Sequence, residues 1–257
     1  MKPEAIKTAY GSPFAVLFAR RYKSVLYIRG MKITYYGHSC FLVETGGKRL
    51  LFDPFISGNP LAGHIHVNNI RCDYILLTHA HSDHIGDLET IVRNNPEATL
   101  VGIWEIHAHY SAKGFRTHPM NKGGWRSFDF GRLKMVNAVH SSSFPDGSYA
   151  GEPVGFIVHT TDGTIYVAGD TALTRDMELI PQTCPPLDLA VLPIGSNFTM
   201  DIHDAVIASV FLQCRQIIGC HYDTFGFIKI NHEEAINAFA EQSKELILLP
   251  IGETKAF

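Results

Sequence analysis

The feature that most constrains the fold is a seven-residue stretch, Thr78 to His84, which holds three histidines and one aspartate. The apolar residues 74–77 precede it, and residues 85–92 follow it with the apolar spacing of a helix. This pattern predicts a buried strand, a tight turn and then a helix. The turn is what allows so many polar side chains to point toward one place.

The spacing within this stretch is typical of a metal site. In an extended segment alternate side chains share one face, so His79 and His81 can bind the same ion. Where the chain bends into the helix, Asp83 and His84 project in another direction and can reach a second ion. Neighbouring surface histidines are the alternative, but His-x-His-x-Asp-His is a spaced set of ligands. The stretch therefore predicts metal binding.

The length and composition of the chain fit one large globular domain or two small ones. The chain has 257 residues, and 46% of them are hydrophobic, which is enough for a sizeable core. Its 22 basic and 25 acidic residues give a net charge of -3 without long runs of either sign. This balance offers no basic surface for nucleic acid or an anionic membrane, so we expect neither partner.

The histidine and cysteine counts favour a metal over a disulfide framework. Fourteen histidines stand against five cysteines, an odd number without a Cys-x-x-Cys pair. We expect buried thiols in a reducing compartment at Cys40, Cys72, Cys184, Cys214 and Cys220. No run approaches the roughly 18 apolar residues of a membrane span, and Arg20 and Arg21 follow the short apolar run 14–19. These features predict a cytoplasmic protein.

The first 30 residues differ from the rest of the chain. They carry six basic side chains and one acidic one, and their apolar residues keep neither helical nor strand spacing for long. We predict an N-terminal extension over residues 1–30, disordered or outside the core, and one domain over residues 31–257. An ordinary N-terminal strand and helix is the alternative.

From residue 31 onward the pattern alternates short strands and helices. Glycines at 37, 46 and 47 predict turns of an antiparallel meander with strands at 32–36, 40–45 and 49–53. Further strands are expected at 98–103, 133–139, 154–159, 164–168, 187–192, 217–220 and 246–249. Helices are expected at 85–94, 104–113, 203–213 and 232–243.

Three polar residues outside the stretch follow predicted strands, namely His140, Asp170 and His221. Strands that lie side by side deliver their ends to one edge of a sheet, where the turn at 78–84 also lies. The three residues are therefore expected to join the turn in one site. The combined set is the pattern of a two-metal hydrolase.

The order His-x-His-x-Asp-His, then His, Asp and His, resembles the metallo-β-lactamase superfamily over residues 31–257. Four further segments are similar to bacterial metal-dependent hydrolases of unassigned substrate, near the ascorbate-phosphate lactonase branch; these segments are 36–41, 53–55, 194–200 and 221–225. The resemblance implies an α/β fold, a four-layer αββα sandwich with mixed sheets and helices on the outer faces.

The resemblance also implies a site for two divalent ions. The first ion would be held by His79, His81 and His140, the second by Asp83, His84 and His221, with Asp170 bridging them. These ligands favour Zn²⁺, with Mn²⁺ or Fe as alternatives. A metal-bound hydroxide would cleave a small ester, lactone or phosphodiester, and catalytic roles are expected for Asp83, Asp170 and His38. The substrate is a small molecule, and a homo-oligomer is compatible with the sequence.

Residues around the ligands carry further expectations. Asp53 resembles a strand-end aspartate that supports the metal loop through hydrogen bonds, and a turn-forming role before Pro54 is compatible with this. His38 is expected to donate a proton to a leaving group or bind an anionic substrate, with a structural histidine as the alternative. Asn197 and Thr199 are expected to line the pocket.

The remaining histidines have simpler interpretations. Residues 201–203 depart from the family pattern, which leaves His203 at the pocket rim or, as the favoured alternative, exposed. His64 and His66 lie in a loop, where contact with solvent is favoured over contact with substrate. His107 and His109 point to different sides of a predicted helix, so we exclude them as ligands.

Two other classes of function remain open. The first is a di-iron oxidoreductase on the same fold, a class whose first motif resembles His-x-Glu-x-Asp. This chain has His81 at the position of that Glu, which disfavours an oxidoreductase. A non-catalytic metal-binding protein is the second, and a complete set of ligands argues against it. A nuclease is disfavoured because the near-neutral chain offers no RNA-binding module.

Overall fold

Two seven-stranded sheets face each other at the centre of the fold. A computed structural model describes residues 30–257 of the chain. The strand order is β14-β1-β2-β3-β4-β5-β6 in the first sheet and β13-β12-β11-β10-β9-β8-β7 in the second. Buried side chains of both sheets meet in one core, where the ring centroids of Phe52 and Phe156 lie 6.0 Å apart.

The strands are short. Those of the first sheet are β1 (Lys32–Gly37), β2 (Cys40–Thr45), β3 (Lys48–Phe52), β4 (Tyr74–Leu76), β5 (Thr99–Ile103), β6 (Thr117–Met120) and β14 (Thr254–Ala256). Those of the second are β7 (Arg126–Phe128), β8 (Gly131–Asn137), β9 (Val154–His159), β10 (Thr164–Val167), β11 (Leu189–Pro193), β12 (Gln216–Cys220) and β13 (Glu245–Ile247).

Each sheet combines an antiparallel and a parallel half. Strands β1 to β3 form the predicted meander, and β3 to β6 run parallel. In the second sheet β7 to β10 are antiparallel, whereas β10 to β13 are parallel. All five residues of β11 are buried, as expected for a parallel strand covered on both faces. Parallel neighbours deliver their carboxyl ends to one edge of a sheet, and the candidate site lies at these ends.

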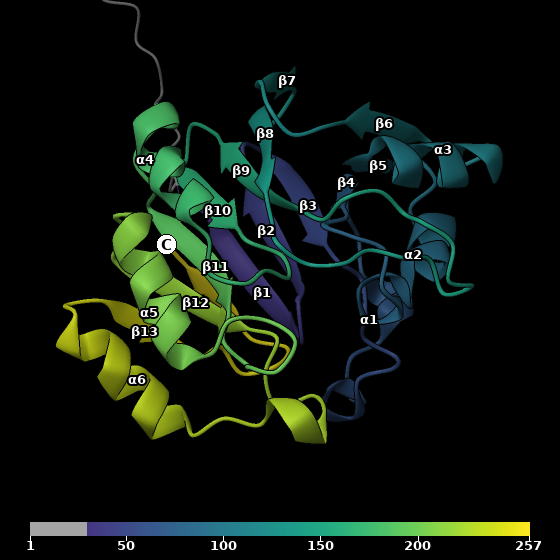
Figure 1. The fold of residues 1–257 in the computed structure, drawn as a ribbon. Helices are drawn as coiled ribbons and strands as arrows, with labels where there is room; N and C mark the ends of the chain where they lie inside the picture. Colours follow the sequence, from purple (N-terminus) through teal and green to yellow (C-terminus); the bar gives the residue numbers. More distant parts are fainter. Residues whose placement is uncertain (1–29) are drawn as a thin grey trace, which may run out of the picture.

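Helices cover the outer faces of both sheets. In Figure 1, α4, α5 and α6 lie on one side of the paired sheets, and α1, α2 and α3 lie on the other. Their bounds are α1 (Ser82–Ile85), α2 (Leu88–Asn94), α3 (Trp104–Ala112), α4 (Ile180–Thr183), α5 (Ile202–Phe211) and α6 (His232–Glu241). The buried residues Ala208 of α5 and Phe239 of α6 pack on the second sheet. The predicted four-layer αββα sandwich is therefore confirmed.

The predicted helix over residues 85–94 is wrong in detail, because two helices occupy this region. Asp87 lies in the break between the two helices. Its carboxylate accepts hydrogen bonds from the backbone N–H groups of Ile56 (2.6 Å) and Ser57 (2.8 Å). Helix α1 begins at Ser82, so the last two candidate ligands of the turn already lie within a helix.

Other predicted bounds also need correction. Strands β6, β7 and β14 were not predicted, and their sequences lack an apolar alternation; β6, for example, reads Thr-His-Pro-Met. Strand β8 ends at Asn137 rather than at residue 139. All five cysteines lie in the described part of the chain and are free, but Cys184 is partly exposed, so its predicted burial is wrong.

The predicted extension over residues 1–30 lies outside the described residues, except for Gly30. Within residues 30–257, no helix combines the length and the apolar character that a membrane crossing requires.

Candidate metal centre

The turn after β4 brings its histidine rings together. His81 has an extended backbone (φ -62°, ψ 150°), and α1 begins at the next residue. His79 and His84 are fully buried, whereas His81 and Asp83 are partly exposed. Nε2 of His79 lies 3.0 Å from Nδ1 of His81. Two ring nitrogens at this distance are aimed at a shared space, as the spacing of the motif predicts.

Asp53, directly after β3, supports this turn from behind. Its Oδ1 accepts a hydrogen bond from the backbone N–H of Thr78 (2.8 Å). Its Oδ2 accepts from the Thr78 hydroxyl (2.6 Å) and pairs with Nδ1 of His84 (2.9 Å). The side chain is 1% exposed, so these bonds are shielded from water. The structure thus has the supporting hydrogen bonds expected of Asp53.

These bonds decide which ring nitrogen of two histidines stays free. The Thr78 hydroxyl gives its hydrogen to Asp53, so it accepts a hydrogen bond from Nδ1 of His79 at 3.0 Å. His84 donates from its own Nδ1 to Asp53. Nε2 therefore keeps its lone pair in the neutral ring of His79, and would do so in His84 once a cation replaces its proton; in both rings Nε2 is the atom nearest Asp170.

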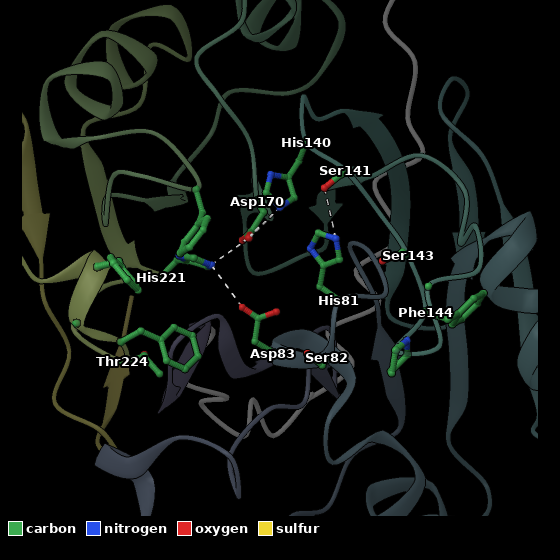
Figure 2. Close-up of a pocket in the computed structure, with 16 residues that line it drawn as sticks. His81, Ser82, Asp83, His140, Ser141, Ser143, Phe144, Asp170, His221 and Thr224 are labelled. Carbon is green, nitrogen blue, oxygen red and sulfur yellow. Dashed lines mark hydrogen bonds and ion pairs between the residues drawn. The ribbon is translucent and has the colours of Figure 1, made fainter.

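The second sheet supplies three more side chains from separate strand ends. His140 follows β8, Asp170 follows β10 and His221 follows β12. Figure 2 shows their polar groups turned toward the same central space as those of His81 and Asp83. The seven predicted ligands therefore come together, although they span residues 79–221.

The side chains form two groups around this space. The ligand atoms within each group all lie within 4.8 Å of one another. One group consists of His79, His81 and His140, and the other consists of His38, Asp83, His84 and His221. A third set that meets the same limit, Asp53, His79 and His84, combines one ring from each group with the supporting aspartate. Apart from His38, this division matches the one that the family resemblance implies.

Asp170 lies between the two groups. Its Oδ2 is 3.6 Å from Nε2 of His140 and 3.9 Å from Nε2 of His79, both in the first group. The same oxygen is 3.0 Å from Nε2 of His221, and its Oδ1 is 3.4 Å from Nε2 of His84, both in the second. One carboxylate thus reaches both groups.

The chemistry of these atoms fits metal ions. Nε2 of His84 and Oδ1 of Asp170 are buried, and neither has a hydrogen-bond partner. Unpaired buried polar atoms are costly, and a cation between a lone pair and a carboxylate would satisfy both. Imidazole nitrogens with carboxylate oxygens form a donor set typical of Zn²⁺, Mn²⁺ and Fe.

Burial controls the charge of the first group. Desolvation lowers the pKa of His79, His81 and His140, which keeps these rings in the neutral form that binds a metal. His84 differs, since burial acts to lower its pKa but the carboxylates of Asp170 and Asp53 raise it well above its ordinary value. A cation beside Asp170 can take the place of that proton.

His38 lies behind the second group rather than in the open site. Its Nε2 is 3.2 Å from Oδ2 of Asp83, and its Nδ1 is 3.0 Å from the hydroxyl of Thr224. The side chain has no exposed surface, and burial lowers its pKa to about 4 despite the hydrogen bond to Asp83. At neutral pH the uncharged ring can accept at Nδ1 from Thr224 and donate at Nε2 to Asp83.

Three residues of the site have a left-handed backbone. The φ angles of His38, Asp53 and His221 are 55°, 40° and 55°. Residues with a Cβ seldom adopt this conformation, and such strain concentrates at functional sites. The backbone N–H of His221 donates to the carbonyl oxygen of His38 (2.9 Å), which ties two of these turns together.

A cavity of about 970 Å³ opens over the two groups. His81, Asp83, His140, Asp170 and His221 line its floor. The expectation that Asn197 and Thr199 line it is wrong, because the residue between them, Phe198, does so instead. His203 is exposed on α5 and lies in a different groove, so it is not at the rim.

The other histidines lie outside the site. His64 and His66 are exposed, as expected. His107 pairs with the Thr117 hydroxyl (2.7 Å), and His109 stacks on Phe144, so their exclusion as ligands agrees with their contacts. Sequence reasoning missed Thr78 and Thr224. The position of the Thr78 hydroxyl, directly before the histidine motif, could have indicated its role. No local pattern indicates the contact of Thr224 with His38.

Comparisons with known proteins agree with this geometry. A family model described as the β-lactamase superfamily domain matches residues 48–222. A UPF0173 metal-dependent hydrolase of Flavobacterium johnsoniae is 57% identical over 224 residues, covering 87% of this chain and 99% of the relative. The chain belongs to the UPF0173 metal-dependent hydrolases of the β-lactamase superfamily. The predicted family is thereby confirmed.

Another relative and a solved structure also match this chain. A UPF0173 metal-dependent hydrolase of Christiangramia forsetii is 56% identical over 87% of this chain and 99% of its own length. The solved structure of Igni18, a metallo hydrolase of Ignicoccus hospitalis, has a TM-score of 0.80 at 33% identity and covers 89% of this chain and 98% of Igni18. Membership in a hydrolase family favours hydrolysis over the oxidoreductase and non-catalytic alternatives.

Proposed function

We propose that this metal-dependent hydrolase holds two divalent ions, with Zn²⁺ favoured, and cleaves a small ester, lactone or phosphodiester. His79, His81 and His140 would hold one ion, Asp83, His84 and His221 the other, and Asp170 would bridge them. The observation that carries the proposal is the position of Asp170, whose carboxylate is 3.9 Å or less from histidines of both groups. We further propose that residues 31–257 form the hydrolase domain.

Divalent ions bound there would lower the pKa of a bound water to about 7 and polarise the oxygen of the scissile group. The chain's own residues orient these parts. Asp83 and Asp170 line the cavity, and their carboxylates are ionised at neutral pH. Burial acts to raise both pKa values, but a hydrogen bond from His38 lowers that of Asp83, and His84 and His221 lower that of Asp170.

His38 acts through Asp83 in this scheme. Its ring is buried and does not line the cavity, so it does not touch a leaving group directly. Its hydrogen bond holds Oδ2 of Asp83, the oxygen that lies 4.0 Å from Nε2 of His221. We therefore assign His38 as a positioning residue for Asp83, with Asp83 and Asp170 as the carboxylates that touch the reacting groups.

Substrate screening with metal-loaded full-length protein tests this proposal. The panel contains p-nitrophenyl acetate, γ-butyrolactone, a thioester and bis-p-nitrophenyl phosphate. We expect at least one to be cleaved, and His81→Ala to lower kcat/KM by about 100-fold or more. His203→Ala is the matched control, because this exposed histidine lies outside the site. Turnover that is equal in wild type and His81→Ala would refute the proposal.

A further inference from the structure

The cavity over the candidate metal centre has an apolar rim. Its volume of about 970 Å³ lies in the range of pockets that enclose a small organic ligand. Phe144 and Pro145 line it from the loop after β8, and Phe198 lines it from the loop after β11. Phe225 and Phe227 line it from the loop after β12. Three separate loops thus each contribute aromatic surface.

The inner part of this rim is fixed by packing. The ring of Phe144 is 5% exposed and stacks on His109 of α3, with ring centroids 4.0 Å apart and planes 19° apart. The ring of Phe225 packs edge-on against His38, with centroids 5.4 Å apart. In Figure 2, Phe144 and Thr224 flank the central space from opposite sides. The inner walls are therefore preformed.

The outer part of the rim is open to solvent. Phe198 is 51% exposed and Phe227 is 79% exposed. Both line the same cavity as the floor residues, so a ligand bound there can cover their rings. Covering apolar surface is favourable, and it scales with the apolar area removed from water.

The cavity lining has no Lys or Arg side chain among the described residues. Its acidic side chains are Asp83 and Asp170 on the floor. The polar groups above the floor include the hydroxyls of Ser141 and Ser143. An anionic group on the rim would lose water without gaining a cationic partner, which costs free energy.

We infer that the substrate is an ester or lactone whose distal part is apolar, an alkyl chain or an aryl ring, and carries no second anionic group. This inference rests on the proposed hydrolytic function and adds the substrate class. The reacting group lies over the floor between Asp83 and Asp170, and the apolar part lies among the rings of Phe144, Phe198 and Phe227. A phosphorylated sugar lactone does not match this rim.

Hydrolysis of a chain-length series tests the inference. The substrates are the p-nitrophenyl esters of acetate, butyrate, hexanoate and octanoate, with metal-loaded full-length protein. Full burial of a methylene is worth about fourfold, so partial burial on the rim should raise kcat/KM about twofold for each methylene added. Phe198→Ala and Phe227→Ala should lower kcat/KM for the octanoyl ester about fivefold more than for the acetyl ester.

Trp104→Ala is the control for these variants, since this aromatic side chain is 58% exposed but does not line the cavity. It should retain the wild-type rise with chain length. A series that is flat in wild type, or that is changed equally by Trp104→Ala and Phe227→Ala, would overturn the inference.

Binding of two matched carboxylates gives a readout that needs no turnover. Octanoate and suberate have the same number of carbons and differ in a second, distal carboxylate. Calorimetric titration of the metal-loaded protein should show octanoate binding about tenfold or more tighter than suberate, with a smaller difference in Phe227→Ala. Suberate binding that equals or exceeds octanoate binding, or no octanoate binding, would overturn the inference.

The two experiments separate the inference from the proposed function. Selective octanoate binding without cleavage of any ester would support the apolar pocket and count against the proposed hydrolysis. Cleavage of the acetyl ester with a flat series and tight suberate binding would support hydrolysis and overturn the substrate class.

Discussion

The two halves of the site are built in different ways. The first sheet supplies four candidate ligands from the single turn after β4, and Asp53 holds this turn with three hydrogen bonds. The second sheet supplies one residue at a time, from the ends of β8, β10 and β12. The turn is thus a local structure, whereas the second half depends on the whole strand order.

The second half is held by bonds between its loops. The backbone N–H of Val139 donates to the hydroxyl of Thr171 (2.9 Å), and the N–H of Ala172 donates to the carbonyl of Val139 (3.0 Å). These bonds join the segments that carry His140 and Asp170. A change at Asp53 or Thr78 should therefore act on the ligands of the first half indirectly, whereas a change at Asp170 in the second half removes a candidate ligand itself.

The largest effect is expected at Asp170, where the two halves meet. Asp170→Asn keeps the size of the side chain but removes the charge that lies near both groups. We expect fewer than about 0.5 metal ions per chain and a loss of activity of about 1,000-fold or more. Elemental analysis and kcat/KM measure this, and circular dichroism checks the fold. A folded variant with wild-type metal content would contradict the bridging role.

A smaller effect is expected at Asp53, which touches no substrate in this account. Asp53→Asn replaces an acceptor by a donor opposite the Thr78 hydroxyl and Nδ1 of His84. Loss of such support lowers metal affinity by about 10- to 100-fold. Competition with a chromophoric chelator measures the affinity. If only the stability of the fold changed, the proposed coupling between Asp53 and the turn would be wrong.

Thr78→Val should have a weaker effect than Asp53→Asn. It removes the hydroxyl that links Asp53 to Nδ1 of His79, but the backbone bond from Thr78 to Asp53 remains. We expect metal affinity to fall by about three- to tenfold. Ions should be lost preferentially from the first group, which Co²⁺ substitution and absorption spectroscopy can follow. Equal loss from both groups would argue against this division.

The smallest effect is expected at Asp73, which lies directly before β4, at the opposite end of this strand from the candidate metal-binding turn. Its carboxylate accepts hydrogen bonds from the backbone and side chain of Arg49, and the side-chain bond holds its pKa below the ordinary value. Asp73→Asn should leave metal content and activity at wild-type levels. The melting temperature at pH 7 should fall by about 1–3 °C, as expected for one partly exposed ion pair.

The pH dependence of this variant has a definite sign. A carboxyl whose folded pKa is lowered stabilises the fold above its unfolded pKa of about 3.9, and this contribution is lost as the pH falls through the lower, folded value. The difference in melting temperature between wild type and Asp73→Asn should therefore shrink as the pH falls below the unfolded pKa of about 3.9, and disappear once the carboxyl of the folded protein is protonated. A difference that persists there would assign it to packing rather than charge.

Much of this site could be predicted from the sequence because half of it is local. The spacing of His79, His81, Asp83 and His84 follows from side-chain alternation and one turn, which short-range patterns describe well. His140, Asp170 and His221 needed only the rule that neighbouring strands end at one edge. The break between α1 and α2 was missed, because it depends on bonds from Asp87 to residues about 30 positions earlier.

The cavity walls were the least predictable part. Asn197 and Thr199 are expected to line the pocket from the loop after β11, but Phe198, the residue between them, lines it instead. Thr224 reaches His38 across 186 positions, a contact that no local pattern encodes. The cytoplasmic location, the absence of a nucleic-acid partner and the choice of Zn²⁺ stay predictions.

A site for two ions, shared by the two halves of the molecule, is best tested by metal content. Full-length protein purified without chelators is analysed by inductively coupled plasma mass spectrometry, beside His81→Ala and the control His203→Ala. We expect about two transition-metal ions per chain in wild type and control, and about one or fewer in His81→Ala. A wild-type content of one ion or none at saturating metal, or two ions in His81→Ala, would contradict it.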